Sequence, residues 1–213
     1  MIFQKNQTVL FMGDSITDVN RRVAECHPLG QGYPLLVASL VAATYPELGL
    51  RFLNRGVGGN TAKDLEARWQ TDVLAHKPDW LSILVGINDA HRWIENPRDE
   101  SVSPETFAAT YRHLLQITRQ EGKTGFILIE PFYIHADSEH PVRRVLARYQ
   151  ETVRSLAEEF DAIFVPAQRE YDRLLTIQPA SYWTEDSVHP NPAGHGVLTR
   201  LYLKAIGCEG FSA

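Results

Sequence analysis

The chain has 213 residues, of which 44% are hydrophobic and 22% charged, a balance that argues against extended disorder. The formal net charge is −5, from 21 basic and 26 acidic side chains, so we expect no nucleic acid partner. The longest apolar run, residues 35–43, is too short for a membrane span, and the N-terminus does not resemble a secretion signal. We therefore expect a cytoplasmic protein with one domain over residues 1–213. The sequence does not determine the oligomeric state, so a homo-oligomer stays open.

Short apolar runs typical of buried strands alternate with helical segments along the chain. Runs this apolar, without alternation of polar and apolar residues, indicate a parallel sheet that is covered on both faces. The alternation predicts an α/β fold, a three-layer α/β/α sandwich around a central parallel sheet of about five strands. The expected strands cover residues 9–12, 51–54, 81–85, 126–129 and 162–165.

Capping residues and prolines mark the expected helices. One begins after Thr61, with Asp64 placed for a capping box, in a segment that Pro78 ends. Others are expected from Pro104 to Gly122, from about Pro141 to Phe160, and from Pro192 to Gly207. In such folds the functional residues lie just beyond the carboxyl ends of the strands, near the point where the strand order reverses.

Four polar or glycine-rich segments occupy such places. Residues 13–17, 54–60 and 86–89 follow the first three strands, and residues 186–190 precede the last helix. Acyl transfer needs a nucleophile, a base, an orienting carboxylate and donors for the developing oxyanion. These four segments contain all of these groups.

Each role has a candidate. Ser15 is the candidate nucleophile, and His189 is the candidate base, because an imidazole with a pKa of about 6.5 can take and return a proton near neutrality. Asp186 can hold the tautomer of His189. The backbone N–H groups of Ser15 and Gly56 and the side-chain amide of Asn88 can form the oxyanion hole.

With these segments in this order, the chain resembles the SGNH hydrolases, also called the GDSL esterases and lipases. Ile16 stands where the family name expects leucine. The resemblance implies a flavodoxin-like fold and assigns the same roles to Ser15, Gly56, Asn88 and His189. Further stretches resemble the intracellular acetylxylan esterases of this superfamily: residues 45–49 through Gly56 to 64–65 and 68–69, then residues 77–80, 131–134 and 193–195. This implies an esterase that deacetylates xylo-oligosaccharides through an acyl-enzyme, with no cofactor and no metal.

Other functions remain open. The same superfamily includes thioesterases, lysophospholipases and general short-acyl carboxylesterases, and the scaffold could also be a non-catalytic carbohydrate-binding module. The glycine-rich residues 56–60 could cradle a phosphate, although the dinucleotide fingerprint is incomplete. Residues 135–140 have a metal-like composition, but their spacing matches no strong site and favours a solvated surface.

Several residues have a structural interpretation beside a functional one. Asp14 is expected to cap the turn before Ser15, and Asp89 to brace the loop that carries Asn88. His195 is a rival base, for which a structural hydrogen bond is favoured. Trp93 and Trp183 could stack on a sugar ring of the substrate or simply pack against the core, as Trp69 and Trp80 are expected to do.

Overall fold

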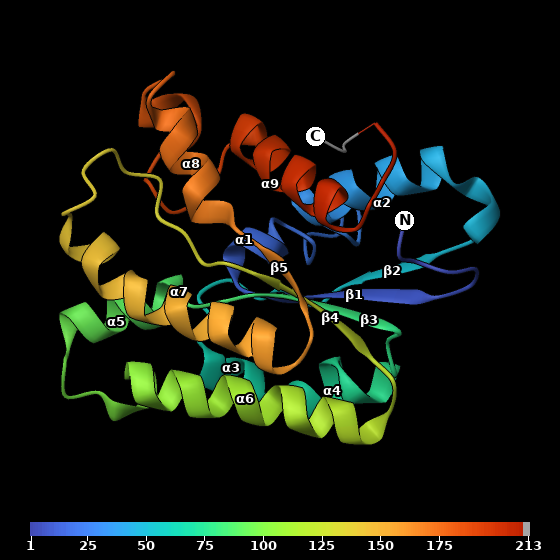
Figure 1. Cartoon of the computed structure of the whole chain (residues 1–213), viewed down its shortest axis with the longest axis horizontal. Coiled ribbons are helices and arrows are strands. Elements are labelled where there is room, and N and C mark those ends of the chain that lie inside the picture. Colours follow the sequence, from blue (N-terminus) through green and yellow to red (C-terminus); the bar gives the residue numbers. More distant parts are fainter. Residues whose placement is uncertain (211–213) are drawn as a thin grey trace.

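A computed structural model describes residues 1–210 and shows a twisted sheet between two layers of helices (Figure 1). All of its strand pairs are parallel, and the order is β2-β1-β3-β4-β5. This architecture confirms the expected α/β/α sandwich. The strands are β1 (Thr8–Gly13), β2 (Arg51–Asn54), β3 (Trp80–Leu84), β4 (Gly125–Ile129) and β5 (Ile163–Val165).

The helices cover both faces of the sheet (Figure 1). On one side lie α2 (Tyr33–Thr44), α8 (Ala167–Leu175) and α9 (Pro192–Ala205). On the other lie α3 (Ala62–Ala67), α4 (Trp69–Asp72), α5 (Ile87–Glu95), α6 (Pro104–Glu121) and α7 (Pro141–Glu159). The short α1 (Ser15–Asp18) follows β1, and single 3₁₀ turns cover Pro46–Leu48, Leu74–His76, Glu100–Val102 and Ala180–Tyr182. Within residues 1–210, no helix is long and apolar enough to cross a bilayer.

The core lies on both faces of the sheet, which explains the continuously apolar strands. Residues 9–12 of β1 have no solvent exposure. Trp69 is 2% exposed, and its indole N–H donates to Thr118 Oγ1 at 2.9 Å, which joins α4 to α6. Trp80 packs half-buried against the core and donates to Gln7. Both tryptophans therefore have the packing role expected of them.

The segment from Thr61 to Pro78 is not one helix, as the sequence suggested, but α3, α4 and a 3₁₀ turn. Thr61 does form the expected capping box with Asp64. The helix is interrupted at Arg68, which has φ −118° and ψ 9°. The Arg68 guanidinium donates to Asn60 Oδ1 and to two backbone carbonyls beyond this segment. These tertiary hydrogen bonds favour the bend over a continuous helix.

The strand order reverses between β1 and β3, because the chain crosses from one edge of β1 to the other. Ser15 directly follows β1, and Asn88 lies in the first turn of α5, directly after β3. Both residues therefore lie at the switch point, where doubly wound sheets place their functional groups.

Candidate active site

A continuous chain of hydrogen bonds joins the beginning of the sequence to its end. Ser15 Oγ lies 2.8 Å from His189 Nε2, although 174 positions separate them in sequence. His189 Nδ1 lies 2.6 Å from Asp186 Oδ2. Because an ionised carboxylate only accepts, the Nδ1–H donates to Asp186 and the Nε2 lone pair accepts from the Ser15 hydroxyl.

The turn between β1 and α1 fixes the position of Ser15. Gly13 ends the strand, and a Cβ there would lie 2.3 Å from the carbonyl oxygen of Leu84, so the close approach requires glycine. Asp14 is the N-cap of α1 and accepts from the Ile16 N–H at 3.0 Å, which confirms the expected capping role. Ser15 is therefore the first helical residue, and its own N–H has no hydrogen-bond partner in the described chain.

The loop before α9 is organised around the Asp186 carboxylate. Its Oδ1 accepts the backbone N–H groups of Val188 at 2.9 Å and His189 at 2.7 Å. The Thr184 hydroxyl donates to the His189 carbonyl at 2.7 Å. Ser187, at φ 68°, accepts the N–H of Ile134 at 2.8 Å. These bonds hold the imidazole on a loop that is otherwise open to solvent.

The same bonds determine the ionisation of Asp186. Partial burial by itself would raise its pKa, but the hydrogen bonds from the His189 side chain and from the amides of His189 and Val188 outweigh burial and lower the pKa to about 2. Asp186 therefore remains an anion that can stabilise an imidazolium on His189.

Two fully buried carboxyl groups flank the site. Burial raises the pKa of Asp14 and that of Asp89 to about 7 each. Asp89 Oδ1 accepts the N–H of Ala62 at 3.1 Å, and thus ties α5 to the start of α3. This contact confirms that Asp89 braces the segment that carries Asn88.

Asn88 is held in a fixed orientation beside this site. Its side-chain amide donates one hydrogen bond to the Asn60 carbonyl at 3.0 Å. An amide group carries two N–H donors, so the second remains available for an oxyanion.

The expectation that the Gly56 amide serves the oxyanion hole is wrong. The Gly56 N–H donates to the buried Asn54 Oδ1 at 2.8 Å, so it is already paired. A Cβ at Gly56 would lie 2.4 Å from the backbone nitrogen of Asp18. Gly56 is therefore needed where the loop after β2 packs closely against α1, a contact that the sequence could not show.

Gly59 presents the available donor in this loop, and sequence reasoning missed it. Its φ is +80°, a Cβ there would meet nothing within 4 Å, and its N–H has no partner within residues 1–210. Its neighbour Gly58 donates to Asp18 Oδ2 at 3.1 Å, and a Cβ on Gly58 would lie 3.8 Å from Ser15 Cβ. Because the amides of Gly56 and Gly58 are already paired, the loop is also a poor phosphate cradle.

The rival base has a structural role, as expected. His195 is 5% exposed, and its Nδ1 accepts the N–H of Tyr33 at 3.2 Å. Burial lowers its pKa to about 4, so the ring is neutral at pH 7. It has no hydrogen bond to Ser15 within the described residues, where Ser15 Oγ instead pairs with His189.

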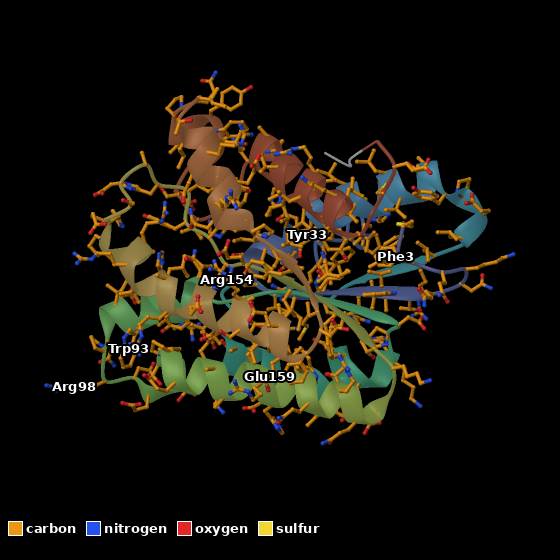
Figure 2. All side chains as sticks on the ribbon, in the orientation of Figure 1. Phe3, Tyr33, Trp93, Arg98, Arg154 and Glu159 are labelled. Atoms are coloured by element: carbon orange, nitrogen blue, oxygen red, sulfur yellow. The ribbon has the colours of Figure 1, made fainter. Side chains whose placement is uncertain are left out.

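The structure does not join either predicted sugar-stacking residue to the triad. Trp93 lies on α5 (Figure 2), about 140° round the helix from Asn88 at 100° per residue. Trp183 packs edge-on against Tyr182, and its indole nitrogen is buried. A part for these two side chains in substrate binding stays a prediction.

A cluster of imidazole rings lies near the triad. His91, three residues after Asn88 and on the same side of α5, packs edge-on against Tyr133 at 6.0 Å. Its Nε2 is buried without a hydrogen-bond partner among the described residues, and burial lowers its pKa. The helical spacing from Asn88 was the signal that could have found it. The rings of His135 and His140 lie 4.3 Å apart at an interplanar angle of 46°, but residues 1–210 contain no group of three side chains that could hold a metal ion.

A serine hydroxyl, an imidazole and a carboxylate in hydrogen-bonded series, beside free N–H donors, define the class of serine-dependent acyl hydrolases. Comparison with known proteins agrees with this class. The model of the GDSL-like lipase/acylhydrolase family matches residues 11–197. The chain therefore belongs to this family, as the sequence resemblance implied, and is a carboxylic ester hydrolase.

Individual relatives are similar over nearly the whole chain. An acetylxylan esterase from Geobacillus stearothermophilus is 43% identical in an alignment of 211 residues that covers 95% of this chain and 95% of the relative. The crystal structure of Axe2, an acetylxylan esterase from the same organism, has a TM-score of 0.91 at 41% identity over 97% of both chains. LAE5, an alpha/beta hydrolase enzyme from the metagenome of Lake Arreo, has a TM-score of 0.91 at 34% identity over 98% of both chains.

Proposed function

We propose that the chain is a serine esterase that removes acetyl groups from xylo-oligosaccharides through an acyl-enzyme on Ser15. The observation that carries the proposal is the hydrogen-bonded series of Ser15, His189 and Asp186. The substrate class rests on the similarity to acetylxylan esterases over nearly the full length. Catalytic mutants of Axe2 have been crystallised in which a serine, an aspartate or a histidine is replaced, and these residue types match the triad here.

In the first half of the reaction, Ser15 Oγ attacks the ester carbonyl carbon while its proton passes to His189 Nε2. The Asp186 carboxylate stabilises the resulting imidazolium through the Nδ1–H. The tetrahedral intermediate collapses as the bond to the sugar oxygen breaks. The imidazolium returns the proton to that oxygen, so the deacetylated sugar leaves and an acetyl group stays on Ser15.

In the second half, water attacks the acetyl carbonyl with His189 as the base. The bond to Ser15 Oγ then breaks, the proton returns to the serine, and acetate leaves. Negative charge develops on the same carbonyl oxygen in both halves. The N–H groups of Ser15 and Gly59 and the second N–H of the Asn88 amide are the donors that we propose for that charge.

A substrate panel tests this proposal. Initial rates would be compared for acetylated xylo-oligosaccharides, for p-nitrophenyl esters of increasing acyl length, for an acyl thioester and for a lysophospholipid. We expect the highest kcat/KM on the acetylated oligosaccharides and a fall with acyl length. A preference for the thioester or the lysophospholipid would replace the proposed substrate. Absence of hydrolysis throughout, in folded protein, would favour a binding module.

A further inference from the structure

A cavity of about 630 Å³ opens beside β2, outside the catalytic site. The exposed edge of β2, one face of α2 and the segment from Arg21 to Leu29 form its walls, and none of the triad residues lines it. Its volume lies within the range of about 300–1,000 Å³ that is typical of small-molecule sites. The proposed esterase reaction does not use this cavity.

Two arginines form the polar end of the cavity. Arg55 Nη2 donates to His76 Nε2 at 2.8 Å, and Arg55 Nε is buried without a hydrogen-bond partner in the described chain. Arg55 also has no ion pair within residues 1–210. A guanidinium is always charged, and that of Arg55 has a neutral hydrogen-bond partner but no carboxylate among the described residues, so this end of the cavity favours an anion.

The second arginine is also incompletely neutralised. Arg21 Nε donates to the Gly56 carbonyl, and its nearest carboxylate oxygen, on Asp18, is 3.9 Å away. That carboxylate is shared, because Asp18 also pairs with Arg22 at 3.1 Å. Burial, and then the charges of the neighbouring arginines, lower the pKa of Arg21. Among the described residues that line the cavity, none is acidic.

Apolar side chains make up most of the remaining wall, which also includes His27, Ser39 and Asn54. Phe52 is fixed by stacking on the buried Phe11, with ring centroids 6.3 Å apart. Leu29, Leu35 and Leu53 complete this surface. A ligand that fills the cavity therefore needs an apolar body several carbons long, and acetate is too small to use these contacts.

We propose that this cavity binds a monocarboxylate with an apolar body, a medium-chain alkanoate or an arylalkanoate. The carboxylate pairs with Arg55 and Arg21, since guanidinium groups match carboxylates in planar, charge-assisted hydrogen bonds. The hydrocarbon lies along Phe52 and the leucines. Because Arg21 also holds the Gly56 carbonyl, the bound carboxylate contacts the base of the loop that reaches Ser15.

Isothermal titration calorimetry at constant ionic strength tests the proposal, with octanoate and phenylbutyrate against their uncharged primary amides. We expect saturable binding of the acids and at least about tenfold weaker binding of the amides. Equal binding of acids and amides, or no binding of the acids up to their solubility, would overturn it.

Three variants locate the site. Arg55→Gln removes the unpaired charge, and Ala42→Trp fills the cavity from an exposed position on α2 without removing charge. Arg98→Gln is the matched control, because Arg98 projects into solvent at the far end of the molecule (Figure 2). We expect the first two to weaken octanoate binding at least about tenfold, and the control to leave it unchanged.

Thermal unfolding and circular dichroism would confirm that each variant is folded. If Arg55→Gln fails to fold, the octanoate affinity of Ala42→Trp still tests the proposal. Full octanoate affinity in Ala42→Trp would place the ligand elsewhere, for example at the triad, and contradict the proposal.

Discussion

The Asp186 carboxylate holds His189 at two points: Oδ2 lies 2.6 Å from the imidazole Nδ1, and Oδ1 lies 2.7 Å from the backbone nitrogen. One side chain thus sets both the path of the loop and the tautomer of the ring. The two oxygens can be tested separately, because an asparagine keeps one acceptor and loses the other.

For this reason we expect Asp186→Asn to fold normally and to lose about 10⁴-fold in kcat, as serine triads do when the tautomer is no longer held. The amide oxygen can still accept the two backbone N–H groups, but the NH₂ cannot accept from Nδ1. Steady-state hydrolysis of p-nitrophenyl acetate measures the effect. Asp137→Asn, on an exposed loop, is the control. A loss below about tenfold would show that Asp186 does not orient the base.

The Asn88 amide is expected to act on the transition state more than on bound substrate. Asn88→Ala should lower kcat about 10²–10³-fold with little change in KM, because the lost donor faces charge that develops only during the reaction. Asn96→Ala, at the exposed end of the same helix, is the control. An unchanged kcat with a raised KM would instead assign Asn88 to substrate binding.

Gly56 and Gly59 should respond differently to alanine. At Gly56 a Cβ meets the backbone of Asp18 at 2.4 Å, so Gly56→Ala should destabilise the fold by about 3 kcal/mol or more. At Gly59 the space is open, so Gly59→Ala should cost only about 1 kcal/mol from its positive φ, while kcat falls as the loop amide moves. Chemical denaturation and kinetics on both variants check this. The reverse pattern would return the oxyanion role to Gly56.

The buried Asp89 makes stability depend on pH in a predictable direction. Its pKa is raised from 3.8 to about 7, so between these values the folded chain keeps a proton that the unfolded chain releases. The free energy of unfolding therefore falls as the pH rises through this range, and the loss is complete above about pH 7. Asp89→Asn removes the contribution of Asp89 to this dependence and leaves that of Asp14, whose pKa is also raised to about 7.

Consequently, Asp89→Asn should raise Tm over the unsubstituted protein by a few degrees near pH 8 and by less near pH 5. Scanning calorimetry across this range makes the comparison, and Glu121→Gln, an exposed change of the same kind, serves as control. A difference in Tm that does not vary with pH would show that Asp89 does not retain the proton.

Much of the fold follows from local patterns in the sequence. The strands are buried on both faces and therefore appear in the sequence as short apolar runs. The helices that begin at residues 62, 104 and 192 have side-chain caps from Thr61, Ser103 and Asn191. The helices that the sequence did not announce, α2, α5 and α8, begin at residues without a side-chain cap. Their stability comes from packing, which local patterns do not reveal.

The candidate site likewise has residues that local sequence signals predict and residues that they do not. Ser15 and His189 were predictable because each lies beside a strand or helix boundary that the sequence marks. Which glycine of the loop has an available amide was not predictable, because the Gly56 N–H donates to Asn54 Oδ1, whereas the Gly59 N–H has no partner within residues 1–210. Similarly, the bend at Arg68 and the charge left on Arg55 depend on contacts between segments that are distant in sequence.

Trapping the acyl-enzyme tests the central claim most directly. The protein would be mixed with excess p-nitrophenyl acetate, quenched in acid within the first turnover, digested and analysed by peptide mass spectrometry. We predict one acetyl group on the peptide that contains Ser15 and none in Ser15→Ala, whose turnover should also fall by several orders of magnitude. An acetyl group on a different residue, or undiminished turnover in folded Ser15→Ala, would contradict the account.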